Sequence, residues 1–220
     1  MALILNIETS TKNCSVALAQ NGKTLALKQI AEDGYLHAEY LHKFIDDVFK
    51  QSNFSLNNLN AVAISKGPGS YTGLRIGVSA AKGLCFALNI PLISLETLTI
   101  LAHSLATQNG TIVPMIDARR MEVYTAIYSS KLKCLQPAFA HIISDDFLQN
   151  LEQPIHLLGD GIEKTQNIFT DSKFIFHKHL KFPSAKEMSK LSYEKYNAKQ
   201  FEDLAYFEPY YLKDFLIQKT

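Results

Sequence analysis

The chain has 220 residues, of which 47% are hydrophobic and 20% are charged, and its formal net charge is +1. These values are typical of a soluble globular protein with a substantial core. The near-neutral charge argues against a protein that binds nucleic acid by itself, since such proteins carry a basic excess or patch.

The three cysteines are widely spaced and form no CxxC pair, which argues against a disulfide scaffold or a zinc site. The N-terminal residues lack the basic region of a signal peptide. No segment approaches the ~20 apolar residues that cross a bilayer. We therefore expect a cytoplasmic protein.

The first part of the chain predicts strands followed by helices. An unbroken apolar run over 3–7 favours a buried central strand, and strands over 14–19 and 24–30 flank the turn signal Asn21-Gly22. Apolar residues recur at helical spacing over 36–50. A strand over 59–65, a glycine-rich turn, a helix over 72–88, a strand over 90–95 and a helix over 96–107 follow.

The second part repeats the opening order of strand, acid, turn and strand. Ile7-Glu8 recurs as Ile116-Asp117, and a further strand covers 122–128. We infer a duplication of two lobes, over 1–107 and a smaller 108–220. The rest predicts helices over 145–151, 162–169 and 185–196, strands over 155–158 and 174–176, and an extended segment over 208–212. We expect the last helix or the tail to pack back on the first lobe.

The glycine-rich turn at 67–70 has two interpretations. Backbone N–H groups at a helix start favour an anion, so the turn and the residues after the first strand could form a phosphate loop. The turn lacks the Gly-Lys-Ser/Thr ending of a Walker A motif. The glycines could instead allow close packing. The candidate phosphate-loop residues are Glu8, Thr9, Ser10, Gly67, Gly69, Ser70 and Thr72.

Small and apolar residues lie on one face of the predicted helix over 72–88. A broad apolar stripe runs along the predicted helix over 36–50. Together they predict a helix–helix interface with a partner. The candidate interface residues are Leu36, Tyr40, Phe44, Val48, Gly73, Leu74, Gly77, Val78, Ala81 and Cys85.

The remaining histidines, charged residues and serines indicate no catalytic or metal site. His37 and His42 are separated by about 140° on a helix, so they do not share a metal ion. Asp117, Arg119, Arg120 and Glu122 form either a solvated hairpin or a contact between lobes or with a partner. No Gly-x-Ser-x-Gly nucleophile elbow occurs. We expect no catalytic residue and no metal site in this chain.

Five runs resemble the TsaB/YeaZ family, which is glycoprotease-like and belongs to the actin/sugar-kinase superfamily. They are ILNIETSTKNCSVAL, KGPGSYTGLRIGVSAAKGL, IDARRMEVY, PSAKEMSKLS and FEPYYLK, and they extend from one end of the chain to the other. The resemblance implies an α/β fold of two ribonuclease-H-like lobes, as in the actin/sugar-kinase ATPases, with the second lobe reduced. Glu8 stands where this superfamily often has Asp.

The resemblance also implies a function. It predicts a non-catalytic scaffold in tRNA threonylcarbamoyladenosine modification, next to the anticodon, that binds and activates a TsaD homologue together with a TsaE homologue. ATP and metal are then expected in the partner subunits, with no cofactor on this subunit alone. We expect a homodimer when the chain is alone, and only indirect contact with tRNA. The alternative is an active ATPase or kinase of the actin-like fold.

Overall fold

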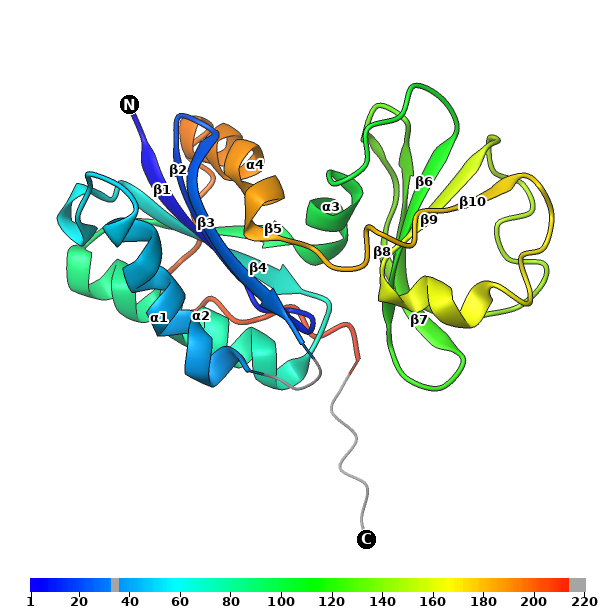
Figure 1. The fold of residues 1–220 in the computed structure, drawn as a ribbon, viewed down its shortest axis with the longest axis horizontal. Coiled ribbons are helices and arrows are strands. Elements are labelled where there is room, and N and C mark those ends of the chain that lie inside the picture. Colours follow the sequence, from blue (N-terminus) through cyan, green and yellow to red (C-terminus); the bar gives the residue numbers. More distant parts are fainter. Residues whose placement is uncertain (33–35, 214–220) are drawn as a thin grey trace, which may run out of the picture.

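The computed structural model describes residues 1–32 and 36–213, which form two lobes side by side (Figure 1). A five-stranded sheet in the order β3-β2-β1-β4-β5 builds the first lobe. Its strands are β1 (Leu3–Glu8), β2 (Asn13–Gln20), β3 (Lys23–Ala31), β4 (Ala61–Gly67) and β5 (Leu92–Glu96). The central strand β1 pairs antiparallel with β2 and parallel with β4, and it is buried throughout, as its apolar run predicts.

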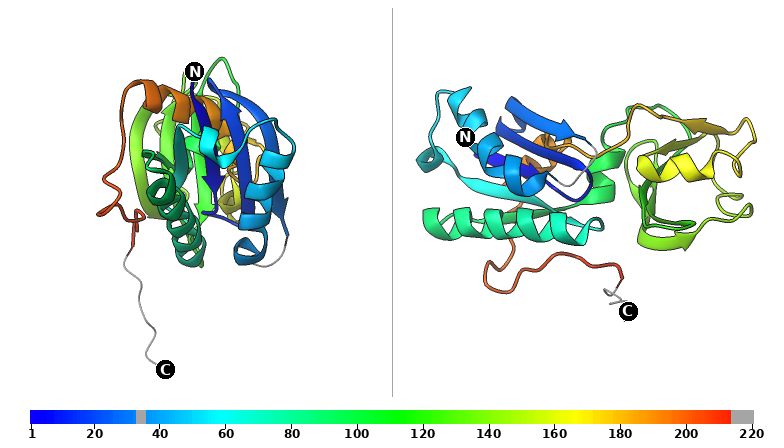
Figure 2. Two further views of the ribbon diagram at one scale, coloured as in Figure 1. Left: turned by 90° about the vertical axis from the view of Figure 1, so that its left-hand side faces the viewer. Right: turned by 60° about the horizontal axis from the view of Figure 1, so that its bottom comes forward.

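Helices cover both faces of this sheet. α1 (His37–Lys50) and α2 (Tyr71–Leu88) pack on one face, where Val48 and Cys85 join Leu5 and Val16 in one core. α4 (Ala185–Asn197) returns from the C-terminal part to the opposite face and buries Met188 against the sheet. The short η1 (Leu56–Asn58) precedes β4. Figure 2 shows α1 and α2 side by side below the sheet.

The second lobe has the same sheet topology. Its order is β10-β9-β6-β7-β8, in which the central β6 pairs antiparallel with β7 and parallel with β9, as β1 does with β2 and β4. The strands are β6 (Thr111–Asp117), β7 (Glu122–Ser129), β8 (Cys134–Ile142), β9 (Ile155–Leu158) and β10 (Phe174–Phe176). The predicted two-lobed α/β fold is therefore confirmed.

The second lobe is built with fewer helices than the first. Turns connect β8 to β9, and the short η2 (Asp160–Thr165) follows β9, at the positions that α1 and α2 occupy in the first lobe. α3 (Thr97–Ala102) lies between the two sheets, where Leu98 and Leu101 pack against Ile112 and Tyr128. The short connections leave this lobe with a smaller core than the first.

Three helices expected in the second lobe and in the segment before it differ in the structure. The helix over 96–107 ends at Ala102, where Ser104 Oγ donates to the carbonyl of Leu101. No helix forms over 145–151, because Leu148 has a φ of 68°, outside the right-handed helical region. The helix expected over 162–169 is the 3₁₀ turn η2 instead.

One strand of the second lobe was not expected from the sequence. β8 was not predicted, since most of its residues are exposed or half-buried and Pro137 interrupts its propensity. The segment over 208–212, expected to be extended, contains no helix and pairs with no strand of either sheet. Among the described residues, no helix is long and apolar enough to cross a membrane.

Candidate functional site

The turn between β4 and α2 packs tightly on the loop after β1. The amide of Ser70 donates to the carbonyl of Ser10 at 2.6 Å. A Cβ added to Gly69 would lie within 3.0 Å of that same carbonyl, and one added to Gly77 would lie within 3.0 Å of Thr9 Oγ1. These positions therefore need glycine, because the two loops approach closer than a side chain permits.

This packing bears on the predicted phosphate loop. The structure brings Thr9 and Ser10 together with Gly69 and Ser70, while Thr72 is exposed in the first turn of α2. Carbonyl oxygens of the chain itself occupy the space beside the start of the helix. Ser70 also caps the helix, since its Oγ accepts from the amide of Gly73 at 3.2 Å. The geometry favours close packing over anion binding.

Gly67 is the third glycine of the turn, and it faces a different segment. Its φ of +114° belongs to a region that side chains rarely adopt, and an added Cβ would lie 2.5 Å from the carbonyl oxygen of Tyr210. The C-terminal segment thus lies directly on the glycine-rich turn.

Glu8 ends β1 and is fully buried. Its Oε1 accepts from the amide of Ser10 at 2.6 Å and from Ser10 Oγ at 2.5 Å. Burial raises the pKa of Glu8 to about 7, against the opposing effect of these hydrogen bonds. The carboxyl group therefore holds the loop after β1 in place and is close to half protonated at neutral pH.

The predicted partner interface requires a correction. Val48, Leu74, Ala81 and Cys85 have no exposed surface, and Phe44 and Val78 are also buried. Gly73 and Gly77 are buried against the loop after β1. Only Leu36 and Tyr40 of that set are partly exposed. The apolar stripe faces the chain's own sheet, as the stripe of a surface helix normally does, so a partner cannot reach it.

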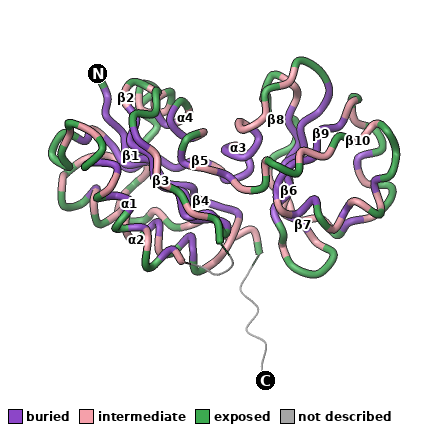
Figure 3. The backbone as a smooth tube through the Cα atoms, viewed as in Figure 1, coloured by how far each residue is buried: buried purple, intermediate pink, exposed green. Residues whose placement is uncertain are grey.

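The outward side of the same two helices forms a groove of about 680 Å³. It is lined by Ala38, His42, Arg75, Ile76, Ser79, Ala80, Gly83 and Leu84. A Cβ added to Gly83 would have nothing within 4 Å, so the backbone is open there. Phe86, on the same helix, exposes 83% of its surface. Figure 3 shows buried and exposed residues alternating along both helices.

The two histidines of α1 lie in different surroundings. His37 is buried beneath the loop after β1, and burial lowers its pKa. His42 is exposed and lines the groove. Across residues 1–32 and 36–213, no group of three or more His, Cys, Asp or Glu residues could hold a metal ion.

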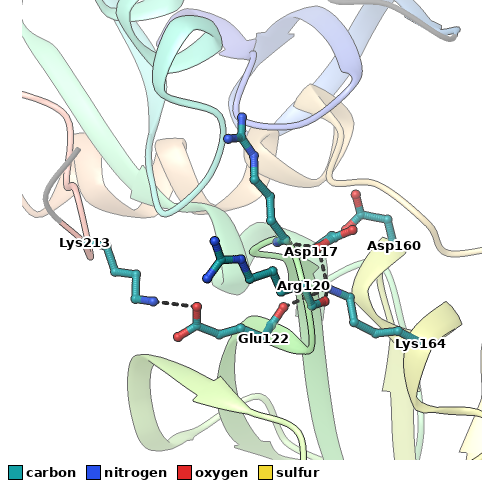
Figure 4. Close-up of polar contacts among 7 residues, drawn as sticks. Asp117, Arg120, Glu122, Asp160, Lys164 and Lys213 are labelled. Atoms are coloured by element: carbon teal, nitrogen blue, oxygen red, sulfur yellow. Dashed lines mark hydrogen bonds and ion pairs between the residues drawn. The ribbon is translucent and has the colours of Figure 1, made fainter. Parts of the chain in front are cut away.

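The hairpin between β6 and β7 is held by one lysine (Figure 4). Lys164 Nζ contacts Asp117 Oδ1 at 2.5 Å and donates to the carbonyls of Arg120 at 2.7 Å and Glu122 at 2.9 Å. The amide of Asp117 donates to Asp160 Oδ1 at 2.9 Å. This charged cluster is therefore a braced hairpin.

The same hairpin also contacts the C-terminal segment. Lys213 Nζ forms an ion pair with Glu122 Oε2 at 2.5 Å (Figure 4). Sequence reasoning considered a contact between lobes or with a partner at this cluster, and it did not identify Lys164 or Lys213. Neither residue is marked by local spacing, because each lies far along the chain from the hairpin.

The family comparisons give a consistent result. A model of the TsaD family, described as tRNA N6-adenosine threonylcarbamoyltransferase, matches residues 34–218. The chain is 28% identical to tRNA threonylcarbamoyladenosine biosynthesis protein TsaB of Escherichia coli, over 96% of this chain and 94% of the relative. It is 30% identical to TsaB of Bacillus subtilis, over 76% and 75%.

A solved structure shares the fold. YeaZ from Pseudomonas aeruginosa superposes with a TM-score of 0.78, covering 96% of this chain and 100% of that one, at 24% sequence identity.

Proposed function

We propose that this chain, which belongs to the TsaB family and takes part in tRNA threonylcarbamoyladenosine biosynthesis, serves in that biosynthesis as a scaffold without catalytic residues of its own. Its partner is a homologue of the transferase TsaD, and a TsaE homologue joins the pair. ATP and metal are bound in those partner subunits, and tRNA is contacted only indirectly.

The outward groove between α1 and α2 carries this proposal. Small side chains at Ser79, Ala80 and Gly83 let another helix approach closely. An exposed aromatic side chain such as Phe86 is of the kind that anchors protein interfaces. Small side chains beside an exposed aromatic side chain are typical of a surface that binds another protein.

The match to the TsaD family model supports the choice of partner. A TsaD homologue that shares this fold presents a comparable pair of helices, and two such pairs can pack as a four-helix arrangement. By the same argument, a second copy of this chain can use the face when TsaD is absent. The homodimer and the complex then compete for one surface.

The alternative, an active ATPase or kinase, finds less support. Glu8 is buried and bonded to its own loop, whereas a catalytic acid must reach the nucleotide phosphates. The carbonyls of Thr9 and Ser10 occupy the space at the start of α2 where an anion would bind.

The proposal is tested with the purified chain and the TsaD homologue of the same organism. We expect a stable complex by size-exclusion chromatography with light scattering, and tRNA modification that requires this chain. Tight ATP binding and ATP turnover by this chain alone would contradict the scaffold role. So would full modification of tRNA without it.

A further inference from the structure

The C-terminal segment 201–213 lies along the first lobe and then beneath α2 (Figure 2). It begins at the edge of the sheet, where the amide of Glu202 donates to the carbonyl of Leu92 at 2.9 Å. Lys82 of α2 donates to the carbonyls of Ala205 at 3.2 Å and Phe207 at 3.0 Å. The segment is therefore bound to the edge strand β5 at its start and to α2 in its middle part.

Farther along, the segment is fixed at both lobes. The amide of Tyr210 donates to the carbonyl of Lys66 at 2.7 Å, next to the glycine-rich turn. Lys213 then pairs with Glu122 of the second lobe. Tyr211 lies between these two anchors, a backbone hydrogen bond at Tyr210 and a side-chain ion pair at Lys213, which together set its position.

Tyr211 holds the one arginine that lines the groove. Arg75 Nε donates to the hydroxyl of Tyr211 at 3.2 Å. The guanidinium carbon lies 4.2 Å from the centre of the Tyr71 ring, and the rings of Tyr71 and Tyr211 are 5.0 Å apart. A cation over an aromatic face is attracted to it, so Arg75 is fixed by two contacts of different kinds.

The guanidinium of Arg75 is held but not neutralised. Its terminal nitrogens make no hydrogen bond, and it forms no ion pair, with any residue of 1–32 and 36–213. Glu208 lies close enough to act on its charge without pairing with it. A planar guanidinium with free donors matches a carboxylate, which can accept two parallel hydrogen bonds.

We propose that Tyr71 and Tyr211 hold Arg75 as a preorganised receptor for a carboxylate of the protein that docks on the groove, so that the C-terminal segment is part of the docking face. This inference rests on the proposed function, and it adds that the partner carries a negative charge where it meets Arg75. Because Arg75 is already ordered, docking loses less side-chain entropy than an unrestrained arginine would.

A protein carboxylate fits this position better than an RNA phosphate. Ile76, Ala80 and Leu84 give the groove beside Arg75 an apolar lining. The chain also has no basic excess, with a net charge of +1. An RNA backbone would leave that apolar lining exposed and would need more cations around it.

The test measures affinity for the TsaD homologue by calorimetry. We expect Arg75→Ala to weaken binding about tenfold or more, and Arg75→Lys to recover little, since lysine lacks the planar fork. Tyr211→Phe should weaken binding severalfold in the wild-type background and add nothing in the Arg75→Ala background. Tyr206→Phe is the matched control on the same segment, because Tyr206 is 84% exposed, and it should change nothing.

The outcomes separate this inference from the proposed function. If the wild-type chain binds the TsaD homologue and Arg75→Ala binds equally well, the inference is overturned and the scaffold role stands. If Arg75→Ala weakens binding to tRNA but not to the TsaD homologue, the inference is also overturned, in favour of RNA. If the wild-type chain does not bind the TsaD homologue, both fall together.

Discussion

The amide of Ser70 donates to the carbonyl of Ser10 at 2.6 Å, and this bond joins the start of α2 to the loop after β1. Within the candidate phosphate loop, Ser10 therefore bonds to Ser70 through its carbonyl and to Glu8 through its amide and hydroxyl. What remains available to another molecule is the opposite side of α2, where the helix and α1 form the groove.

This arrangement predicts opposite effects of alanine at two glycines of α2. Gly77→Ala would place a Cβ within 3.0 Å of Thr9 Oγ1, so we expect it to lower the free energy of unfolding by about 1–3 kcal/mol. Gly83→Ala has open space and removes a helical glycine, so it should raise that free energy by about 0.5–1 kcal/mol. Urea unfolding measures both, and equal effects would contradict the packing described.

The pKa of Glu8 predicts how stability depends on pH. Because burial raises this pKa from 4.5 to about 7, the folded chain binds a proton that the unfolded chain has released between these values. The contribution of Glu8 to stability is therefore fully present below about pH 4.5 and falls as the pH rises to about 7. Glu8→Gln, a neutral isostere, should lose this dependence and be more stable than wild type at pH 8, as thermal unfolding across pH would measure.

His37 should make stability depend on pH in the opposite direction. Burial lowers its pKa, so the folded state favours the neutral ring and loses stability when the pH falls below 6.5. NMR titration should show His37 taking up its proton at a lower pH than a histidine in the unfolded chain. A titration at or above 6.5 would contradict its buried position beneath the loop after β1.

The hairpin between β6 and β7 predicts a stabilising change. Arg119 and Arg120 have φ values of 69° and 48°, a conformation that costs most residues about 1 kcal/mol each and suits Asn-Gly. Replacing Arg119 with Asn and Arg120 with Gly should raise the free energy of unfolding by about 1 kcal/mol. Chemical denaturation would measure it, with Lys133→Asn on the next turn as an exposed control.

The sequence predicted the elements whose patterns are local. The unbroken apolar run over 3–7 gave β1, and helical spacing gave α1 and α2 to within one residue. The repeat of Ile7-Glu8 as Ile116-Asp117 indicated the second lobe, whose sheet has the same order as the first. Each of these patterns is carried by a short run of neighbouring residues, including each copy of the repeat.

The face of α2 could not be assigned in the same way. Periodicity groups Leu74, Val78 and Cys85 on one face, but it does not say whether the chain's own sheet or a partner covers that face. The structure shows that the sheet covers it. Leu74→Arg should therefore unfold the chain, and it is no test of partner binding.

The tail was expected to pack on the first lobe, but its individual contacts could not be predicted, for a related reason. Tyr210 and Tyr211 bind residues far away in the sequence, and the segment has no periodicity of its own. The contact between Lys213 and Glu122 is likewise set by the tertiary fold. Only the structure connects these residues to the groove.

The most direct test of the scaffold account is binding of the TsaD homologue by a variant with a charge in the groove. Gly83→Arg adds a long side chain at an open, exposed position, and Ser172→Arg adds the same side chain on an exposed turn of the second lobe. We predict that both variants fold like the wild type by circular dichroism. Gly83→Arg should lose at least about tenfold in affinity, while Ser172→Arg binds normally. Wild-type affinity in a folded Gly83→Arg chain would contradict the account.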